Sequence, residues 1–111
     1  MWIRRKVQHG NKTGRKIGFP TINLNVGNIE YSNGVYDCEV KIQNQVYKGA
    51  LYFGPGFKKH KKVLEIFVIN FNKKVYGKLI SFKIGKKIRG PKKFDNLNLL
   101  KKQITDDLKQ V

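Results

Sequence analysis

Apolar and polar side chains alternate along the stretch Gly34-Val35-Tyr36-Asp37-Cys38-Glu39-Val40-Lys41-Ile42. Because successive side chains of a β-strand point to opposite faces, a period of two predicts a strand with one apolar face. That face carries Tyr36, Cys38, Val40 and Ile42. Gln43-Asn44 is a predicted turn into residues 45–53, so the stretch forms the first half of an antiparallel hairpin.

A second pair of strands is predicted further along the chain. Residues 63–71 are strongly apolar, Asn72-Lys73-Lys74 reads as a turn, and residues 75–84 are predicted to be the partner strand. Its apolar face consists of Tyr76, Ile80, Phe82 and Ile84. Two glycine- and lysine-rich segments, 10–18 and 54–62, interrupt the pattern and are predicted loops.

Only the C-terminal end has helical spacing. One apolar stripe repeats at intervals of three and four residues and consists of Leu97, Leu100, Ile104, Leu108 and Val111. Asp95 is the predicted N-cap, and Phe94 is expected to pack against Leu99 across the first turn. Closely spaced antiparallel strands with one terminal helix predict a mainly-β chain that forms a small closed barrel. The length of 111 residues predicts a single domain, 1–111.

The composition excludes several classes of protein. No apolar run approaches the roughly 20 residues that a membrane-spanning helix needs, and no apolar segment follows the basic N-terminus as in a secretory signal. Cys38 is the only cysteine, which rules out an intrachain disulfide and a multi-cysteine zinc site. A reducing, cytoplasmic location is therefore expected.

The net charge of +17 indicates a surface that attracts polyanions such as nucleic acids or nucleotides. One interpretation is a basic β-barrel that binds RNA or DNA without catalysis, using the aromatic residues Tyr47, Tyr52 and Phe53. The other is that abundant lysine solvates the surface and has no specific partner. Charge alone does not choose between them.

The segment Gly18-Phe19-Pro20-Thr21-Ile22-Asn23 is a candidate metal and phosphate site. In an extended chain Thr21 and Asn23 share a face, where a hydroxyl and an amide carbonyl supply two oxygen ligands suited to Mg²⁺. Upstream, glycines at 10, 14 and 18 would allow backbone N–H groups to approach a phosphate, with Arg15 adding charge. The alternative is an ordinary loop that leads into a strand.

Glu65 is the second candidate, because it lies within the apolar segment 63–69 on the same face as Val63, Phe67 and Ile69. A carboxylate in such a place is costly to desolvate. A general base beside a substrate hydroxyl would explain it. A strand end that reaches solvent, or a pairing with one of the many lysines, would explain it equally well.

Taken in order, these segments resemble the riboflavin kinase family over nearly the whole chain. The matching pieces are Val7-Gln8-His9-Gly10, Gly14-Arg15, Gly18-Phe19-Pro20-Thr21-Ile22-Asn23, Gly34-Val35-Tyr36, Val63-Leu64-Glu65, Tyr76-Gly77, the segment Ile88 to Phe94, and the helix from Leu97. The sequence departs from the family pattern at Gly56, Phe67 and Asn70, and around Gly90-Pro91.

The resemblance implies a fold and an activity. The fold is a six-stranded antiparallel Greek-key β-barrel with a C-terminal α-helix. The activity is transfer of the γ-phosphate of ATP to the 5′-hydroxyl of riboflavin, with Mg²⁺ as cofactor, riboflavin/FMN and ATP/ADP as ligands, and a monomeric state. Bacterial relatives usually carry an adenylyltransferase domain ahead of the kinase; this sequence shows none, so we expect no FAD synthesis by that route.

The resemblance also implies roles for individual residues. Glu65 would be the catalytic base. The nucleotide would be bound by Gly10, Arg15, Thr21, Asn23, Val68, Asn70 and Tyr76, of which Thr21 and Asn23 would also hold the metal. The flavin would be bound by Arg89, Lys92 and Phe94. Two other functional interpretations of the sequence are a nucleic-acid-binding barrel without catalysis and a degenerate flavin-binding module. For the kinase, nucleic-acid binding is expected to be weak and non-specific.

Overall fold

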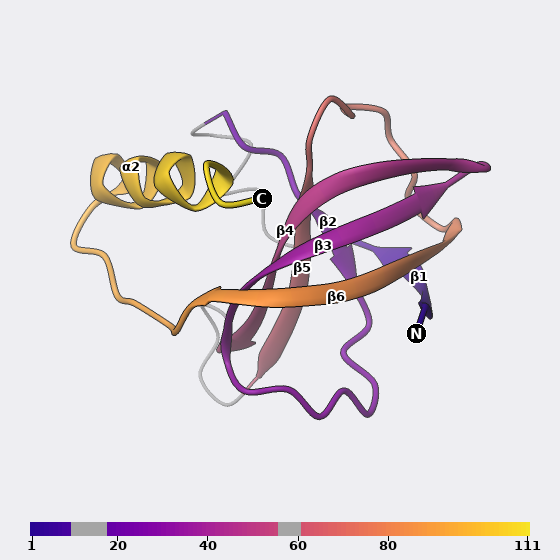
Figure 1. The fold of residues 1–111 in the computed structure, drawn as a ribbon, viewed down its shortest axis with the longest axis horizontal. Coiled ribbons are helices and arrows are strands. Elements are labelled where there is room, and N and C mark those ends of the chain that lie inside the picture. Colours follow the sequence, from indigo (N-terminus) through magenta and orange to yellow (C-terminus); the bar gives the residue numbers. More distant parts are fainter. Residues whose placement is uncertain (10–17, 56–60) are drawn as a thin grey trace.

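The computed structural model describes residues 1–9, 18–55 and 61–111. Its elements are β1 (Ile3–Gln8), β2 (Ile22–Leu24), β3 (Gly34–Ile42), β4 (Gln45–Pro55), β5 (Lys62–Val68), β6 (Leu79–Arg89) and α2 (Leu97–Leu108). The six strands close into an antiparallel barrel in the order β1-β2-β5-β4-β3-β6, and α2 lies outside it on one side (Figure 1). No helix in the described ranges is long and apolar enough to cross a membrane.

The strand order confirms the Greek-key topology. Strands β3, β4 and β5 follow one another as antiparallel neighbours, and β6 then returns to pair with β3. Three consecutive strands with a fourth beside the first is the arrangement that defines a Greek key. Strands β1 and β2 complete the ring between β6 and β5.

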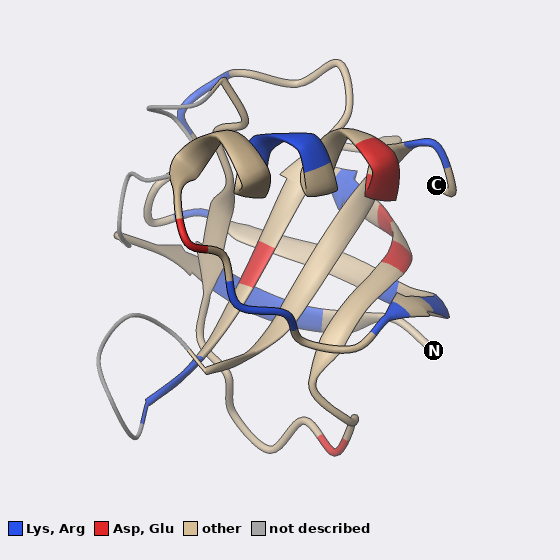
Figure 2. Cartoon of the chain, turned by 90° about the vertical axis from the view of Figure 1, so that its left-hand side faces the viewer, with Lys and Arg blue, Asp and Glu red and all other residues tan. Residues whose placement is uncertain are grey.

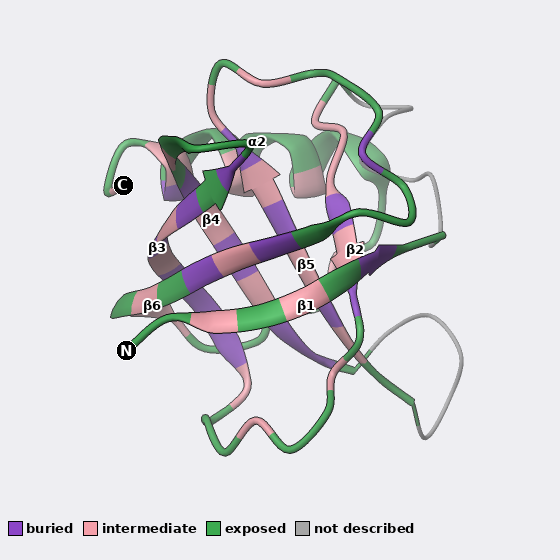
Figure 3. Cartoon of the chain, turned by 90° about the vertical axis from the view of Figure 1, so that its right-hand side faces the viewer, coloured by how far each residue is buried: buried purple, intermediate pink, exposed green. Residues whose placement is uncertain are grey.

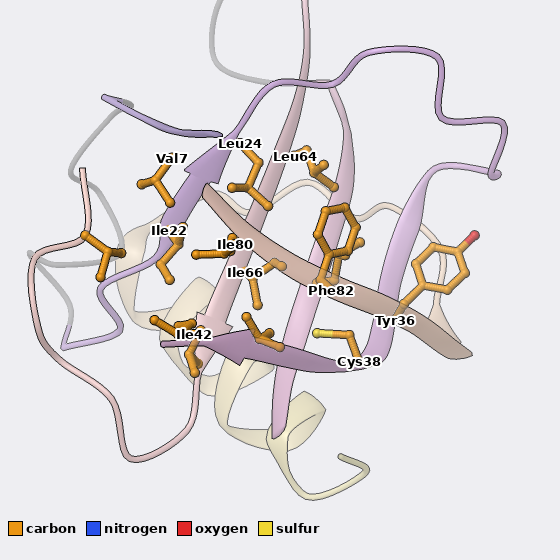
Figure 4. Close-up of a cluster of buried hydrophobic side chains, with 14 of the residues drawn as sticks. Val7, Ile22, Leu24, Tyr36, Cys38, Ile42, Leu64, Ile66, Ile80 and Phe82 are labelled. Carbon is orange, nitrogen blue, oxygen red and sulfur yellow. The ribbon is translucent and has the colours of Figure 1, made fainter. Parts of the chain in front are cut away.

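The core fills the inside of the barrel with alternate side chains from all six strands (Figures 3 and 4). The predicted apolar face of β3 is confirmed, since all four of its residues are buried. Leu51, Leu64, Ile66 and Phe82 have no exposed surface. Each fully buried side chain of this size stabilises the fold by about 1.5–3 kcal/mol relative to its exposed state, so the interior alternation holds the barrel closed.

The predicted hairpin turn between β3 and β4 is also confirmed. Gln43 and Asn44 both have positive φ, at 49° and 68°. Two consecutive residues with positive φ form a turn whose twist matches that of the flanking strands. The register that follows pairs Ile42 with Gln45 and continues to Gly34 opposite Phe53.

The bounds predicted for the last two strands were wrong, and so was their pairing with each other: β5 pairs with β2 and β4, whereas β6 pairs with β1 and β3. Strand β5 ends at Val68 because Asn70 takes a left-handed backbone conformation, with φ 62°, which a β-ladder does not accommodate. Strand β6 begins at Leu79, after a turn in which the Lys78 N–H donates to the Val75 carbonyl. Tyr76 therefore belongs to that turn and not to the apolar face of β6. The strand continues to Arg89 because it pairs with β3 through two irregularities in register.

The predicted helix cap is corrected by one residue. Asn96, and not Asp95, is the N-cap of α2, and its Oδ1 accepts a hydrogen bond from the Leu99 N–H at 3.0 Å. The contact expected between Phe94 and Leu99 requires Leu99 to be the fourth residue of the helix. With Asn96 as the N-cap, Leu99 is the third residue, and its side chain is 47% exposed. Phe94 instead lies beside two cationic side chains, described below.

Candidate active site

One row of residues crosses the outer face of the barrel. Strand pairing places Gln8 opposite Asn23, Asn23 opposite Glu65, Glu65 opposite Tyr52, Tyr52 opposite Val35, and Val35 opposite Arg89. Directly opposed residues of antiparallel strands carry their side chains on the same face, with Cβ atoms about 5 Å apart. We call these six residues the outer row. Helix α2 lies outside the barrel, in front of the strands in the view of Figure 2.

Glu65 occupies the middle of the outer row. Its neighbours Leu64 and Ile66 point inward and are fully buried, so the carboxylate points outward with Val63 and Phe67. The face that Glu65 shares with these two residues is the one predicted from the sequence, whereas Ile69, also placed on it, lies beyond the end of β5. The position of Glu65 is nevertheless half-buried, and burial raises the pKa of Glu65 above its ordinary value of 4.5. A carboxylate with a raised pKa is a stronger base, which suits it to accept a proton from a hydroxyl.

Tyr52 lies beside Glu65 and was not singled out as a kinase residue from the sequence. Its hydroxyl donates to the Pro55 carbonyl at 2.7 Å. Burial raises the pKa of Tyr52, the charge of Glu65 raises it further, and the charge of Arg89 lowers it. Tyr52 is thus within electrostatic reach of both the candidate base and the candidate flavin-side cation. Only the assembled sheet reveals this, because the three residues come from three strands.

Thr21 and Asn23 lie on the other side of Glu65. Asn23 is in β2 directly opposite Glu65, and Thr21 precedes it by two residues, just before the strand begins. Pairing brings the Asn23 amide carbonyl and the Glu65 carboxylate to one place, and the Thr21 hydroxyl comes from two residues earlier in the chain. All three are hard oxygen donors of the kind that Mg²⁺ prefers. The donor set therefore fits the magnesium site expected from the sequence. The described residues contain no cluster of three or more His, Cys, Asp or Glu side chains arranged to hold a metal.

A cavity of about 290 Å³ opens beside this group, between β1, β2 and β5. It is lined by Gln8, His9, Asn23, Leu24, Asn25, Val26, Lys62, Val63 and Leu64. Lys62 and the amides of Gln8, Asn23 and Asn25 give it a polar lining with one cation. Such a lining suits an anionic group such as a phosphate.

Arg89, Lys92 and Phe94, the expected flavin-binding residues, lie close together. The guanidinium of Arg89 and the ammonium of Lys92 are each 5.9 Å from the centre of the Phe94 ring. Arg89 Nε also donates to both carboxylate oxygens of Asp107 in α2, at 2.9 and 3.1 Å. The three residues thus form one group at the Arg89 end of the outer row.

The other expected nucleotide-binding residues do not lie in the outer row. Val68 is 2% exposed within the core, so its contact with a ligand would have to come from its backbone. Asn70 lies in the turn after β5, and Tyr76 stacks on His9 with ring centroids 3.6 Å apart. Gly10 and Arg15 lie outside the described residues.

Two further residues of this region were missed by sequence reasoning. Asp107 is 2% exposed, and Gln103 Nε2 donates to its Oδ1 at 2.9 Å. A signal existed: Asp107 lies three residues after Ile104 and four before Val111, so helical spacing places it on the apolar stripe. A carboxylate on that stripe needs a buried partner, but the sequence does not say which.

The sequence matches a protein-family model, described as Flavokinase: Riboflavin kinase, over residues 1–111. A bifunctional riboflavin kinase/FMN adenylyltransferase of Buchnera aphidicola is 39% identical over 98% of this chain and 37% of its own length. A protein of Bacillus subtilis named RNA-binding riboflavin kinase RibR is 37% identical over 96% of this chain and 47% of its own. The chain thus spans only part of these relatives.

Two solved structures also match 97% of the chain. A Streptococcus pneumoniae protein, described as a macrolide-efflux protein, has a TM-score of 0.86 and 32% identity, over 37% of its own length. Riboflavin kinase from Trypanosoma brucei has a TM-score of 0.69 and 22% identity, over 74% of its own length. The second likeness supports the barrel fold at a low level of sequence identity.

Proposed function

Because the chain belongs to the riboflavin kinase family, we propose that it transfers the γ-phosphate of ATP to the 5′-hydroxyl of riboflavin. The products are FMN and ADP. The observation that carries the proposal is the placement of Asn23 directly opposite Glu65 on the outer face. This brings an oxygen donor for a metal and a base for a hydroxyl to one spot, and phosphoryl transfer needs both.

In the proposed reaction Glu65 accepts the proton of the riboflavin 5′-hydroxyl. A bond forms between that oxygen and the γ-phosphorus, while the bond from the γ-phosphorus to the β,γ-bridging oxygen breaks and its electrons leave with ADP. Burial raises the pKa of Glu65, which makes the carboxylate a better proton acceptor. The protein otherwise contributes mainly by holding the two substrates in line.

The metal and the nucleotide belong to the Thr21 and Asn23 side of Glu65. Thr21 and Asn23 would hold Mg²⁺, which when bound neutralises phosphate charge. Gly10 and Arg15 would contact phosphates, and Asn70, Tyr76 and the Val68 backbone would line the adenine side. On the opposite side of Glu65, Phe94 would pack on the flavin ring, with Arg89 and Lys92 supplying polar contacts.

A direct assay tests the proposal. The protein is incubated with riboflavin, ATP and MgCl₂, and FMN is separated from riboflavin by chromatography. We expect FMN to form at a rate that depends on protein and on ATP, and chelation by EDTA should stop it. A folded protein that forms no FMN under these conditions would refute the proposed activity.

The metal site makes a more specific prediction. Replacing Thr21 or Asn23 with alanine removes one oxygen donor, so we expect turnover to fall by about ten-fold or more, which corresponds to ~1.4 kcal/mol or above. Initial rates measured across a range of Mg²⁺ concentrations check this. Thr105→Ala and Asn98→Ala are matched controls on the exposed side of α2 and should keep full turnover. Unchanged rates in both site variants would contradict the assignment.

Weak binding to nucleic acid is a second proposed property, favoured by a basic surface away from α2. Strand pairing places Arg4 opposite Ser81, and Ser81 opposite Lys41. The exposed side chains of Arg4, Lys6, Lys41 and Lys83 form a basic face over β1, β6 and β3, around the half-buried Ser81, on the side of the barrel seen in Figure 3. The relative named as an RNA-binding riboflavin kinase adds support from outside the chain.

We expect this face to bind polynucleotides non-specifically. Each phosphate contact on a single strand contributes about −0.7 to the slope of log K against log salt, so affinity should collapse between low and physiological salt. Fluorescence polarisation with a labelled oligonucleotide measures the slope. Glutamine at Arg4, Lys6, Lys41 and Lys83 should flatten it, whereas glutamine at Lys73, Lys74, Lys101 and Lys102 should not. Tight, salt-resistant, sequence-selective binding would contradict a purely electrostatic contact.

The remaining parts of the proposal concern the chain as a whole. Residues 1–111 would act as a single riboflavin kinase domain, as a monomer and in the cytoplasm. The support for the location is that Cys38 is the single cysteine of the sequence, so no intrachain disulfide forms. Its thiol is buried, and burial raises its pKa to about 12. Such a thiol stays protonated and unreactive.

A further inference from the structure

Asp107 is the one charged residue that is buried among the described residues. Its carboxylate accepts a bifurcated hydrogen bond from the single Nε–H of Arg89, at 2.9 and 3.1 Å to the two oxygens, and a second hydrogen bond from Gln103 Nε2 at 2.9 Å. A buried carboxylate is costly unless it is paired and hydrogen-bonded. The molecule satisfies that need with Arg89, 18 residues away in the sequence.

The contact with Asp107 restrains the Arg89 guanidinium and leaves some of its N–H donors able to bind a ligand. A guanidinium has five N–H donors in a fixed plane. The Nε–H of Arg89 donates to the Asp107 carboxylate, and its Nη1 donates to the Gly90 carbonyl at 3.0 Å. No hydrogen bond from Nη2 to a described residue is present. That edge of the guanidinium is held in one orientation and can donate to a ligand.

The same helix also reaches Lys92. Gln103 donates to Asp107 through Nε2, and its Oε1 accepts a hydrogen bond from Lys92 Nζ at 3.4 Å. Two residues one helical turn apart in α2 therefore contact both cations that flank the Phe94 ring. The chain Arg89–Asp107–Gln103–Lys92 connects the end of β6, the segment after it and the helix.

We propose that Asp107 and Gln103 are positioning residues, which hold Arg89 and Lys92 around Phe94 in the arrangement that receives the flavin ring. This inference rests on the proposed function. Long cationic side chains lose rotamer freedom when they bind a ligand, and restraining them beforehand removes that cost from binding. Helix α2 would then determine the affinity for riboflavin, with little influence on the metal and the base further along the outer row.

The test compares Asp107→Asn with Asp106→Asn. Asparagine is nearly isosteric but removes the charge that holds Arg89, whereas Asp106 is exposed and pairs only with Lys109 at 3.7 Å among the described residues. We expect Asp107→Asn to raise the KM for riboflavin by about ten-fold, the effect of losing ~1.4 kcal/mol, while kcat and the KM for ATP stay within about two-fold. Gln103→Ala should show the same split more weakly, and Asp106→Asn should match the unmodified protein.

A double-variant cycle separates positioning from general support of the fold. If Asp107 acts through Arg89, the riboflavin KM of Arg89→Ala/Asp107→Ala should equal that of Arg89→Ala alone. Multiplicative effects of the two substitutions, or a fall in kcat together with both KM values, would overturn the inference. Riboflavin binding followed by its fluorescence without ATP gives a readout independent of the kinase reaction. Binding weakened by Asp107→Asn supports positioning even if no FMN forms, and unchanged binding overturns it.

Discussion

Glu65→Gln is expected to leave the barrel folded and able to bind riboflavin while turnover falls by about 10²–10⁴-fold, the usual contribution of a positioned general base. Glutamine keeps the size and polarity of the side chain but does not accept the proton of the 5′-hydroxyl. The measurement is the initial rate of FMN formation, with riboflavin binding and thermal unfolding recorded on the same preparation.

The pKa of Glu65 predicts how the variant differs in stability and in pH dependence. Burial raises this pKa above 4.5, so the folded state favours the protonated form, and ionisation opposes folding at any pH above the raised value. Below the ordinary value this cost disappears. At neutral pH we therefore expect Glu65→Gln to unfold at a temperature no lower than the unmodified protein. In the unmodified enzyme kcat/KM should fall on acidification with a midpoint above pH 4.5, and this dependence should vanish in Glu65→Gln.

The matched control is Glu39→Gln, a half-buried glutamate on the outer face of β3, outside the outer row. It removes one carboxylate from the barrel surface without touching the site, so turnover should be retained. A folded Glu65→Gln protein that binds riboflavin and phosphorylates it at a near-normal rate would show that another group is the base.

Gly34→Ala is expected to destabilise the barrel by about 2–6 kcal/mol, because backbone strain and overpacking each cost of the order of 1–3 kcal/mol. Gly34 has φ +156°, a conformation that side-chain-bearing residues rarely adopt. A Cβ atom there would clash with the backbone carbonyl oxygen of Arg89 and come within 2.7 Å of Lys87 Cε. The end of β6 would have to move, and Arg89 with it.

Urea unfolding measures this loss, and the reactivity of Cys38 provides a second probe. Cys38 is 1% exposed with a pKa of about 12, so it should react with a thiol reagent only after the barrel opens. Gly90→Ala is the matched control, since a Cβ added there would have no described atom within 4 Å and the φ of Gly90 is not positive. If the two variants had equal free energies of unfolding, the backbone around Gly34 and Arg89 would be able to move apart without loss of stability, which would contradict the prediction.

The amino-acid pattern by itself determined the strand at residues 34–42, its hairpin and the C-terminal helix. Each depends on neighbours in the sequence: the alternation about Cys38 and Val40, the Gln43-Asn44 turn, and the stripe from Leu100 to Leu108. The pattern also indicated a small closed barrel and singled out Thr21, Asn23 and Glu65 as candidate site residues. The six-stranded Greek-key order and the other site residues came from resemblance to a family, because no periodicity in residues 1–24 predicted β1 or the three-residue β2.

The tertiary structure decided the end of β5, the start of β6 and the neighbours of the site residues. Val75 and Tyr76 look like strand residues locally, but Val75 is 6% exposed within a turn and Tyr76 stacks on His9. The outer row exists only because six strands meet in one register, and Asp107 finds Arg89 only after α2 lies against the barrel. Alternation shows which face of a strand is apolar, whereas the energy of pairing distant strands depends on closure of the barrel, which local sequence does not encode.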